Sequence, residues 1–228
     1  MSVRAELRDR KGKRKIFIVD DHPAVQQGLA AVIAQQTDLE LCGGASSARE
    51  ALQAIAETKP DVIIVDLSLL EGSGLELLKD LRARHQKLPL LVLSMHDEVL
   101  YAERALHAGA SGYVMKKEPM SVLLTALRQV LKGEVYLSDR LKSRIVGSYV
   151  GRTQPVLYSP VEVLSDRELE VFELIGQGFG TQEIARQLNL SMKTVSCYRQ
   201  NIKSKLGLKG GPELIRHAIH WAEARTSA

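Results

Sequence analysis

The sequence has few cysteines and lacks long apolar runs. Its 228 residues include only Cys42 and Cys197, which cannot form a disulfide framework and suit a reducing compartment. No run approaches the ~18 apolar residues that a membrane helix needs, and the N-terminus lacks the apolar segment of a signal peptide. We therefore expect a cytoplasmic protein that does not associate with membranes.

Charge is distributed unevenly along a chain of otherwise ordinary globular composition. Residues 1–15 hold seven Lys and Arg against two acids, whereas residues 16–135 hold eleven against sixteen. An acidic part joined to basic parts suggests two separate roles. Residues 191–209 hold five bases and no acid, which favours contact with a polyanion.

The first part of the chain shows a strand–helix alternation. Runs that are apolar at every position are typical of strands buried on both faces of a parallel sheet. Such runs occur at Ile16–Val19, Val62–Val65 and Leu90–Leu93, with weaker candidates at Leu39–Cys42 and Tyr113–Met115. Helical patterns separate them: residues 25–33 (with Pro23 in the first turn), Ala48–Glu57, Leu75–Arg84, Val99–His107 and Met120–Leu131. This alternation predicts an α/β domain, a doubly wound five-stranded parallel sheet.

The second part predicts four short helices, which form a small all-α domain. The first begins at Ser165, whose capping box includes Glu168, and reaches about Gln177. The others cover Thr181–Leu188, the stretch from Ser191 to Gly207, and a segment opened by Pro212. We divide the chain into a basic tail at 1–14, an α/β domain at 15–135, a linker at 136–160 with one short helix at 139–150, and a helical domain at 161–228.

Polar residues follow the predicted strands at their carboxyl ends, where parallel sheets bind ligands. They are Asp20, Asp21, Asp66, Ser94 and, past the last strand, Lys116. Three close carboxylates repel unless a cation joins them, and hard oxygen ligands suit Mg²⁺. A cation, a lysine and a hydroxyl around one carboxylate would neutralise a phosphoryl group in transfer. The alternative is that the aspartates cap helices. Capping would account for one aspartate alone, such as Asp21, better than for all five residues together.

These residues lie in segments that resemble the receiver domain of bacterial two-component response regulators, which has a flavodoxin-like fold. The segments are IFIVDD at 16–21, DVIIVDLSLLEGSG at 61–74, LLVLS at 90–94 and GYVMK at 112–116. The resemblance implies that Asp66 is the phosphoacceptor. It implies Mg²⁺ ligands from Asp21, Asp66, the Ser68 backbone carbonyl and, through water, Asp20.

The same resemblance implies a switch around the phosphoryl group. Lys116 would pair with that group, Ser94 would hydrogen-bond to it, and Tyr113 would move inward behind Ser94. Leu70 departs from the family pattern, because the family usually has proline four residues after the acceptor. This departure concerns the shape of the loop rather than the chemistry.

The second and third predicted helices of the all-α domain form a helix-turn-helix. In the third helix the apolar residues share one face: Val195, Tyr198, Ile202 and Leu206. The other faces are basic and free of acids, which fits the major groove of DNA. A solvated face on a protein-binding bundle is the alternative.

Residues 164–208 resemble the LuxR-type DNA-binding domain of the NarL/FixJ response regulators. The resemblance rests on Arg167-Glu168, Glu183-Ile184-Ala185, Ser191-x-Lys193-Thr194-Val195 and Lys205-Leu206-Gly207. It implies DNA contacts from Thr181, Lys193, Thr194, Ser196, Cys197, Arg199, Gln200, Lys203 and Lys205. Lys193, Thr194, Lys203 and Lys205 would bind phosphates; Ser196, Cys197 and Gln200 would face bases, beside Arg199. Gly180 and Tyr198 depart from the usual Ser or Thr cap and the frequent His.

We therefore expect a DNA-binding response regulator and not an enzyme. A sensor histidine kinase would phosphorylate Asp66 with Mg²⁺, and the resulting switch would control transcription. A phosphoryl-transfer enzyme is an alternative, although Ser68, rather than a second acid, lies two residues after Asp66. A regulator that acts through a protein partner or independently of phosphorylation is another. The last helix carries two apolar stripes, one more than a small core needs, which favours a homodimer in the phosphorylated or DNA-bound state.

Overall fold

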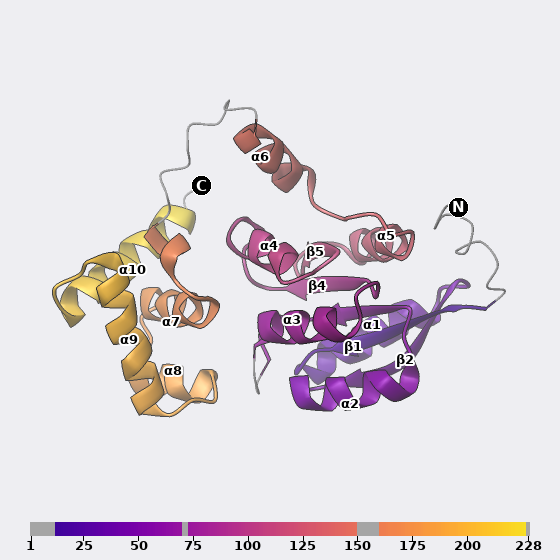
Figure 1. Cartoon of the computed structure of the whole chain (residues 1–228), viewed down its shortest axis with the longest axis horizontal. Helices are drawn as coiled ribbons and strands as arrows, with labels where there is room; N and C mark the ends of the chain where they lie inside the picture. Colours follow the sequence, from indigo (N-terminus) through magenta and orange to yellow (C-terminus); the bar gives the residue numbers. More distant parts are fainter. Residues whose placement is uncertain (1–11, 70–72, 150–159, 227–228) are drawn as a thin grey trace. The chain divides into compact units, whose positions relative to one another are not determined.

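The computed structural model describes residues 12–69, 73–149 and 160–226 (Figure 1). The chain divides between Val146 and Gly147 into two compact units. Residues 1–11 of the expected tail, Leu70, and residues 150–159 of the expected linker lie outside the described residues. Each unit is therefore described by itself.

The first unit contains a five-stranded, all-parallel sheet. Its strands are β1 (Arg14–Val19), β2 (Leu39–Ala45), β3 (Val62–Val65), β4 (Leu90–Ser94) and β5 (Gly112–Met115). They lie in the order β2-β1-β3-β4-β5. Since this is the flavodoxin-like order of a doubly wound sheet, the predicted fold class is confirmed.

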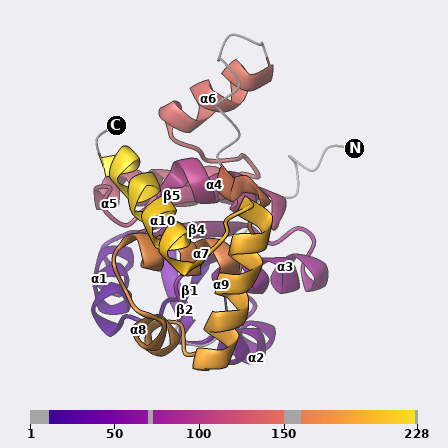
Figure 2. The ribbon, with the colours of Figure 1, turned by 90° about the vertical axis from the view of Figure 1, so that its left-hand side faces the viewer.

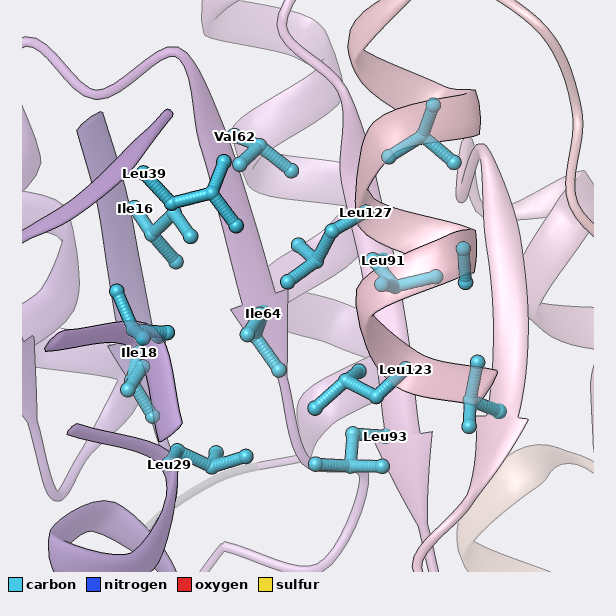
Figure 3. Packing of buried hydrophobic residues seen from close by; sticks show 14 residues of the cluster. Ile16, Ile18, Leu29, Leu39, Val62, Ile64, Leu91, Leu93, Leu123 and Leu127 are labelled. Carbon is cyan, nitrogen blue, oxygen red and sulfur yellow. The ribbon is translucent and has the colours of Figure 1, made fainter. Parts of the chain in front are cut away.

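Five helices alternate with the strands and cover both faces of the sheet (Figure 1). They are α1 (Pro23–Ala34), α2 (Ala48–Thr58), α3 (Gly74–Arg84), α4 (Glu98–His107) and α5 (Met120–Leu131). Ile16 and Ile18 pack with Leu29 of α1 and Leu127 of α5 in one core (Figure 3). Phe17 alternates to the opposite face and is just as buried. This double burial explains why the strand sequences are apolar at every position.

The second strand is longer than the sequence indicates. It continues past Cys42 through Gly43 and Gly44 to Ala45, and its register against β1 shifts after Ile16. A Cβ added at Gly43 would lie 2.8 Å from Cε2 of Phe17, so the small residue lets the Phe17 ring pack against this strand. Glycine is depleted in strands, which is why residue patterns end this strand early.

The chain after α5 adds one bridge to the edge of the sheet. Tyr136 accepts a hydrogen bond from the Tyr113 N–H (3.2 Å) and donates its own N–H to Ser111 (3.0 Å). Helix α6 (Asp139–Tyr149) follows, with the Ser138 hydroxyl accepting from the Leu141 N–H (3.1 Å). The segment that follows α5 is thus hydrogen-bonded to β5.

The second unit is all helical (Figure 2). It contains the 3₁₀ turn η1 (Pro160–Val163) and the helices α7 (Asp166–Gly176), α8 (Thr181–Gln187), α9 (Met192–Leu206) and α10 (Gly211–Thr226). The Ser165–Glu168 capping box opens α7, and Gly207 ends α9 at φ 67°. Its small core includes Phe172, Ile202 and Leu214. Among the described residues, no helix is long and apolar enough to span a bilayer.

Candidate functional site

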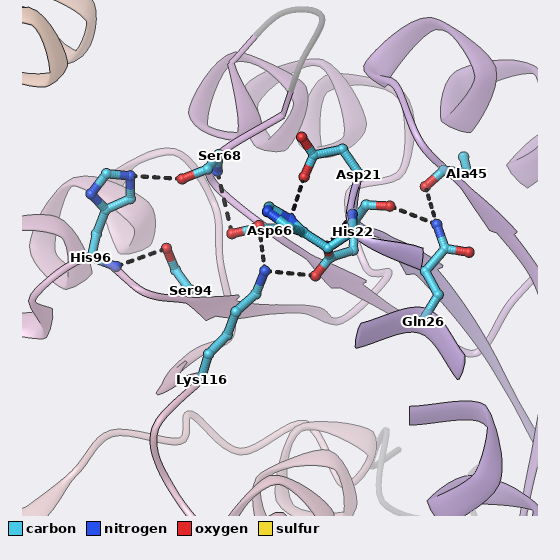
Figure 4. A network of polar contacts seen from close by, with 10 residues as sticks. Asp21, His22, Gln26, Ala45, Asp66, Ser68, Ser94, His96 and Lys116 are labelled. Atoms are coloured by element: carbon cyan, nitrogen blue, oxygen red, sulfur yellow. Dashed lines mark hydrogen bonds and ion pairs between the residues drawn. The ribbon is translucent and has the colours of Figure 1, made fainter. Parts of the chain in front are cut away.

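The carboxyl ends of the strands bring the predicted polar residues together (Figure 4). Asp20 follows β1, Asp66 follows β3, Ser94 ends β4 and Lys116 follows β5. Asp20 and Asp66 are each 2% exposed and Ser94 is fully buried. The parallel topology alone explains this convergence, because all strand ends lie at the same edge of the sheet.

One lysine bridges two of the carboxylates. Lys116 Nζ lies 2.6 Å from Asp66 Oδ2 and 2.8 Å from Asp20 Oδ2. Burial lowers the pKa of Lys116, but the charges of Asp66 and Asp20 outweigh burial and the net pKa is raised. Burial raises the pKa of Asp66 and outweighs the opposing effect of Lys116. Both pKa values are therefore raised. Two acidic partners keep Lys116 charged, whereas Asp66 shares its one lysine with Asp20, and this lysine does not offset burial.

The third carboxylate lies beside this bridge, and one of its oxygens is buried without a hydrogen bond. Asp21 Oδ1 is buried and makes no hydrogen bond, although His22 Nδ1 approaches to 2.7 Å outside hydrogen-bond geometry. Ligand atoms of Asp20, Asp21, His22 and Asp66 all lie within 4.8 Å of one another. Three carboxylates against one lysine leave an excess of negative charge, so these residues fit a divalent cation.

The switch residues meet at a residue that the sequence analysis did not single out. The His96 N–H donates to Ser94 Oγ (3.2 Å), and the His96 carbonyl accepts from Tyr113 Oη (2.8 Å). Tyr113 is buried at 1% exposed, and its movement on phosphorylation stays a prediction. The His96 ring also shares a 2.9 Å hydrogen bond with Ser68 Oγ, and the Ser68 N–H donates to Asp66 Oδ1 (3.3 Å).

Two further residues at this edge were missed. Gln26 Nε2 donates to the backbone carbonyls of Asp20 (2.6 Å) and Ala45 (3.2 Å), which ties the ends of β1 and β2 together. His22 donates its N–H to Asp20 Oδ1 (2.9 Å). In the sequence, His22 stands directly after two aspartates, which marks it as part of the same polar cluster. Gln26 has no such mark in the sequence.

The helix-turn-helix consists of α8 and α9 (Figure 2). Ser191 caps α9 by accepting from the Thr194 N–H (3.0 Å), and Asn189 in the turn has φ 51°. Val195 and Ile202 are fully buried, as expected for the core side. Of the proposed DNA contacts, Lys193, Ser196, Cys197, Gln200 and Lys205 are exposed, while Thr181, Thr194, Arg199 and Lys203 are half-buried.

The ammonium group of Lys205 has a partner inside its own unit. Lys205 Nζ lies 2.6 Å from Oε2 of Glu168, a buried acid in the capping box of α7. Burial raises the pKa of Glu168, but the hydrogen bonds from Lys205 and Ser165 outweigh burial and lower it. Lys205 therefore stabilises the fold in this structure, and this contact competes with a phosphate.

Helix α10 carries one buried and one exposed apolar stripe. Leu214 and Ala218 are fully buried, whereas Ile215 is 41% and Ile219 is 36% exposed. The exposed pair lies in a groove with Pro212, Arg216, His220 and Glu223. This is the surplus stripe that the sequence predicts.

Comparisons with known proteins match both units. Residues 16–128 match the response regulator receiver domain, and residues 162–218 match the bacterial regulatory proteins of the luxR family. The oxygen regulatory protein NreC of Staphylococcus aureus is 38% identical over 209 residues, which cover 90% of this chain and 96% of NreC.

Solved structures give the same result. RcsB of Salmonella enterica serovar Typhimurium, bound to promoter rprA with the phosphomimetic BeF₃⁻, aligns with a TM-score of 0.61 and 26% identity over 91% of this chain and 98% of RcsB. A LuxR-family regulator from Aurantimonas aligns with a TM-score of 0.57 and 31% identity over 61% of this chain and 99% of that one.

A receiver domain with an acidic pocket, joined to a LuxR-type helix-turn-helix, defines a DNA-binding response regulator of a two-component system. The chain belongs to the NarL/FixJ subfamily of these regulators.

Proposed function

We propose that Asp66 accepts a phosphoryl group from a sensor histidine kinase. A carboxylate oxygen of Asp66 attacks phosphorus, a P–O bond forms, and the bond from phosphorus to the imidazole nitrogen of the kinase breaks. The observation that carries this proposal is the position of Asp66, which is buried at the sheet edge with Lys116 at 2.6 Å and the Ser68 N–H at 3.3 Å. Lys116 and the Ser94 hydroxyl would then offset the charge of the phosphoryl oxygens.

Asp21, Asp66 and the Ser68 backbone carbonyl would hold Mg²⁺, with Asp20 contributing through water. The excess of carboxylates over lysine and the buried Asp21 Oδ1, which makes no hydrogen bond, support this assignment. The cation would supply charge compensation for the phosphoryl group. Lys116 bridges Asp20 and Asp66 beside this ligand set.

The proposal is tested by phosphorylation of the full chain with acetyl phosphate and Mg²⁺. Intact mass should show one added phosphoryl group in the parent and none in Asp66→Asn. Asp80→Asn serves as the matched control, because Asp80 is an exposed acid of α3. Full labelling of Asp66→Asn would contradict the assignment.

Phosphorylation would control sequence-specific DNA binding and transcription. The group adds about −1.5 to −2 charge, and a local change of this size can bias a two-state element. The protein would work in the cytoplasm as a transcription factor rather than an enzyme, because Ser68, instead of a second acid, lies two residues after Asp66. The RcsB structures, solved on promoter DNA and as dimers on DNA, support DNA binding as a homodimer.

A gel shift tests the DNA-binding part separately. The full chain should retard a random duplex at low salt, because basic helices bind phosphates without regard to sequence. Absence of any shift, in protein that accepts the phosphoryl group, would favour regulation through a protein partner. Equal affinity for a selected site with and without phosphorylation would favour a regulator that is independent of it.

A further inference from the structure

His96 contacts parts of the receiver that lie far apart in the sequence (Figure 4). Its backbone bonds to both switch residues, Ser94 and Tyr113. Its ring bonds to Ser68, 28 residues earlier. The same ring stacks on Tyr101 of α4, with centroids 4.3 Å apart and planes 28° from parallel.

These contacts form a chain from the phosphoacceptor to α4. Ser68 donates its N–H to Asp66, so a group placed on Asp66 must displace or redirect Ser68. The Ser68 hydroxyl holds the His96 ring, and that ring rests on Tyr101, which is fully buried. The bond between Ser68 and His96 is exposed, but the His96 ring stacks on a buried side chain, and a closely packed interior passes a displacement of that ring on rather than absorbing it.

We propose that His96 is a positioning residue, which couples the state of Asp66 to α4 through its side chain. This inference rests on the proposed phosphorylation of Asp66. The backbone of His96 supports the switch residues, while its ring joins the acceptor loop to the helix. The competing view assigns the coupling to Ser94 and Tyr113 alone and makes the His96 ring a passive filler.

Two substitutions separate the contacts of the ring. His96→Ala removes the bond to Ser68 and the stack on Tyr101, but leaves the backbone bonds to Ser94 and Tyr113 possible. His96→Phe keeps an aromatic ring against Tyr101 and removes the hydrogen bond to Ser68. His107→Ala is the matched control, because His107 is an exposed histidine at the end of α4.

The experiment uses the full chain with Mg²⁺, with and without acetyl phosphate. Intact mass measures the phosphoryl group, and amide hydrogen exchange measures the response of residues 98–107. We expect every variant to accept one phosphoryl group. The change in α4 exchange should fall about fivefold in His96→Phe, the effect of losing about one net hydrogen bond, and by a larger factor in His96→Ala, which also loses the stack on Tyr101. His107→Ala should respond like the parent.

Each outcome bears on one proposal. A parent that takes no phosphoryl group refutes the proposed function itself. A labelled parent whose α4 does not respond, or a His96→Ala variant whose α4 responds fully, refutes the role of His96. Full retention of the response in His96→Phe would show that the bond to Ser68 transmits nothing, which also overturns the proposed route.

Discussion

Asp66 lies where ionisation is unfavourable, and this has a measurable consequence. Asp66 and Asp20 share Lys116 at the end of the sheet, and burial raises the pKa of Asp66 above the 3.8 of an ordinary aspartate. The folded state therefore holds the Asp66 proton more tightly than the unfolded state does. Charging Asp66 costs folding stability as the pH rises above 3.8 and through the raised pKa.

Asp66→Asn should therefore be more stable than the parent at neutral pH in EDTA. We expect a gain on the order of 1 kcal/mol, because replacing a buried charge with a neutral isostere removes a desolvation cost. The difference should vanish below pH 3.8, where Asp66 is protonated in both states. Urea unfolding over a pH series measures the difference, and added Mg²⁺ should narrow it. A less stable Asp66→Asn variant at neutral pH would show that Lys116 fully compensates the charge.

The two adjacent aspartates should contribute unequally to cation binding. Asp20 already engages Lys116 and the His22 N–H, whereas Asp21 Oδ1 has no hydrogen bond. Asp21→Ala should weaken Mg²⁺ affinity about tenfold or more, and Asp20→Ala should weaken it less. A Mg²⁺ titration followed by calorimetry compares the two variants. Unchanged affinity in Asp21→Ala would remove it from the ligand set.

Residues that follow strands could be identified from the sequence, and residues defined by tertiary contacts could not. Asp20, Asp66, Ser94 and Lys116 each follow an apolar run, so the rule about strand ends places them together. His96 and the Lys205–Glu168 pair have no comparable signal. Their roles depend on side chains 28 and 37 positions away, and no local period encodes such a contact.

At the level of elements, periodicity predicts both units because each buries its apolar residues regularly. The strand β3 and the helix α5 match their predicted bounds, since apolar residues fill the whole of each segment. The strand β2 extends past its predicted end. It includes Gly43, a residue type of low strand propensity, whose lack of a side chain leaves room for the Phe17 ring. The bridge at Tyr136 was not predicted either, since it depends on a partner strand.

We expect different residues of α9 to contact the phosphates and the bases of DNA. Lys193, Arg199 and Lys203 supply three cations per copy once Lys205 is assigned to Glu168. At ~0.9 counterion per phosphate, a dimer's log–log salt slope from α9 should be no steeper than about −5. Lys203→Ala should weaken all duplexes alike and flatten that slope by about 1–2. Gln200→Ala should cost about 1–3 kcal/mol on the correct site only.

A duplex selected from random sequence and its scrambled counterpart, titrated over a salt series, measure both effects. Lys205→Ala is the informative control. It should lower the stability of the helical unit by about 1–2 kcal/mol, because it leaves Glu168 buried without its cation, and should barely change the slope. A base preference altered by Lys203→Ala but not by Gln200→Ala would reverse the assignment of the two faces.

For the whole molecule, an acidic segment and a basic helix in separate units imply separate roles. The receiver segment 16–135 is acidic, which suits a pocket that gathers a cation, and α9 carries bases without acids. A single recognition helix contacts few base pairs, so a second copy extends the site. The unit that binds DNA also carries the exposed stripe of α10.

The stripe of Ile215 and Ile219 should form the contact between two copies on DNA. Leu214 and Ala218 already fill the core of the unit, so the exposed pair is free to face the same pair of a second α10 across a two-fold axis. One helix per copy buries less than the ~1,000 Å² of a stable interface, so this contact alone should leave the unphosphorylated protein monomeric. Dimers should therefore require phosphorylation or DNA, which add contacts or bring the copies together.

Ile219→Glu tests this surface directly. It should prevent dimers on DNA and weaken binding to a two-half-site duplex at least tenfold, while binding to a single half-site stays unchanged, because a carboxylate in each helix repels its counterpart. Val163→Glu is the control, since Val163 is 57% exposed and lies outside α10. Light scattering of the phosphorylated protein on DNA gives the stoichiometry. A parent that scatters as a monomer there would remove the dimer, and a dimeric Ile219→Glu complex would move the interface away from α10.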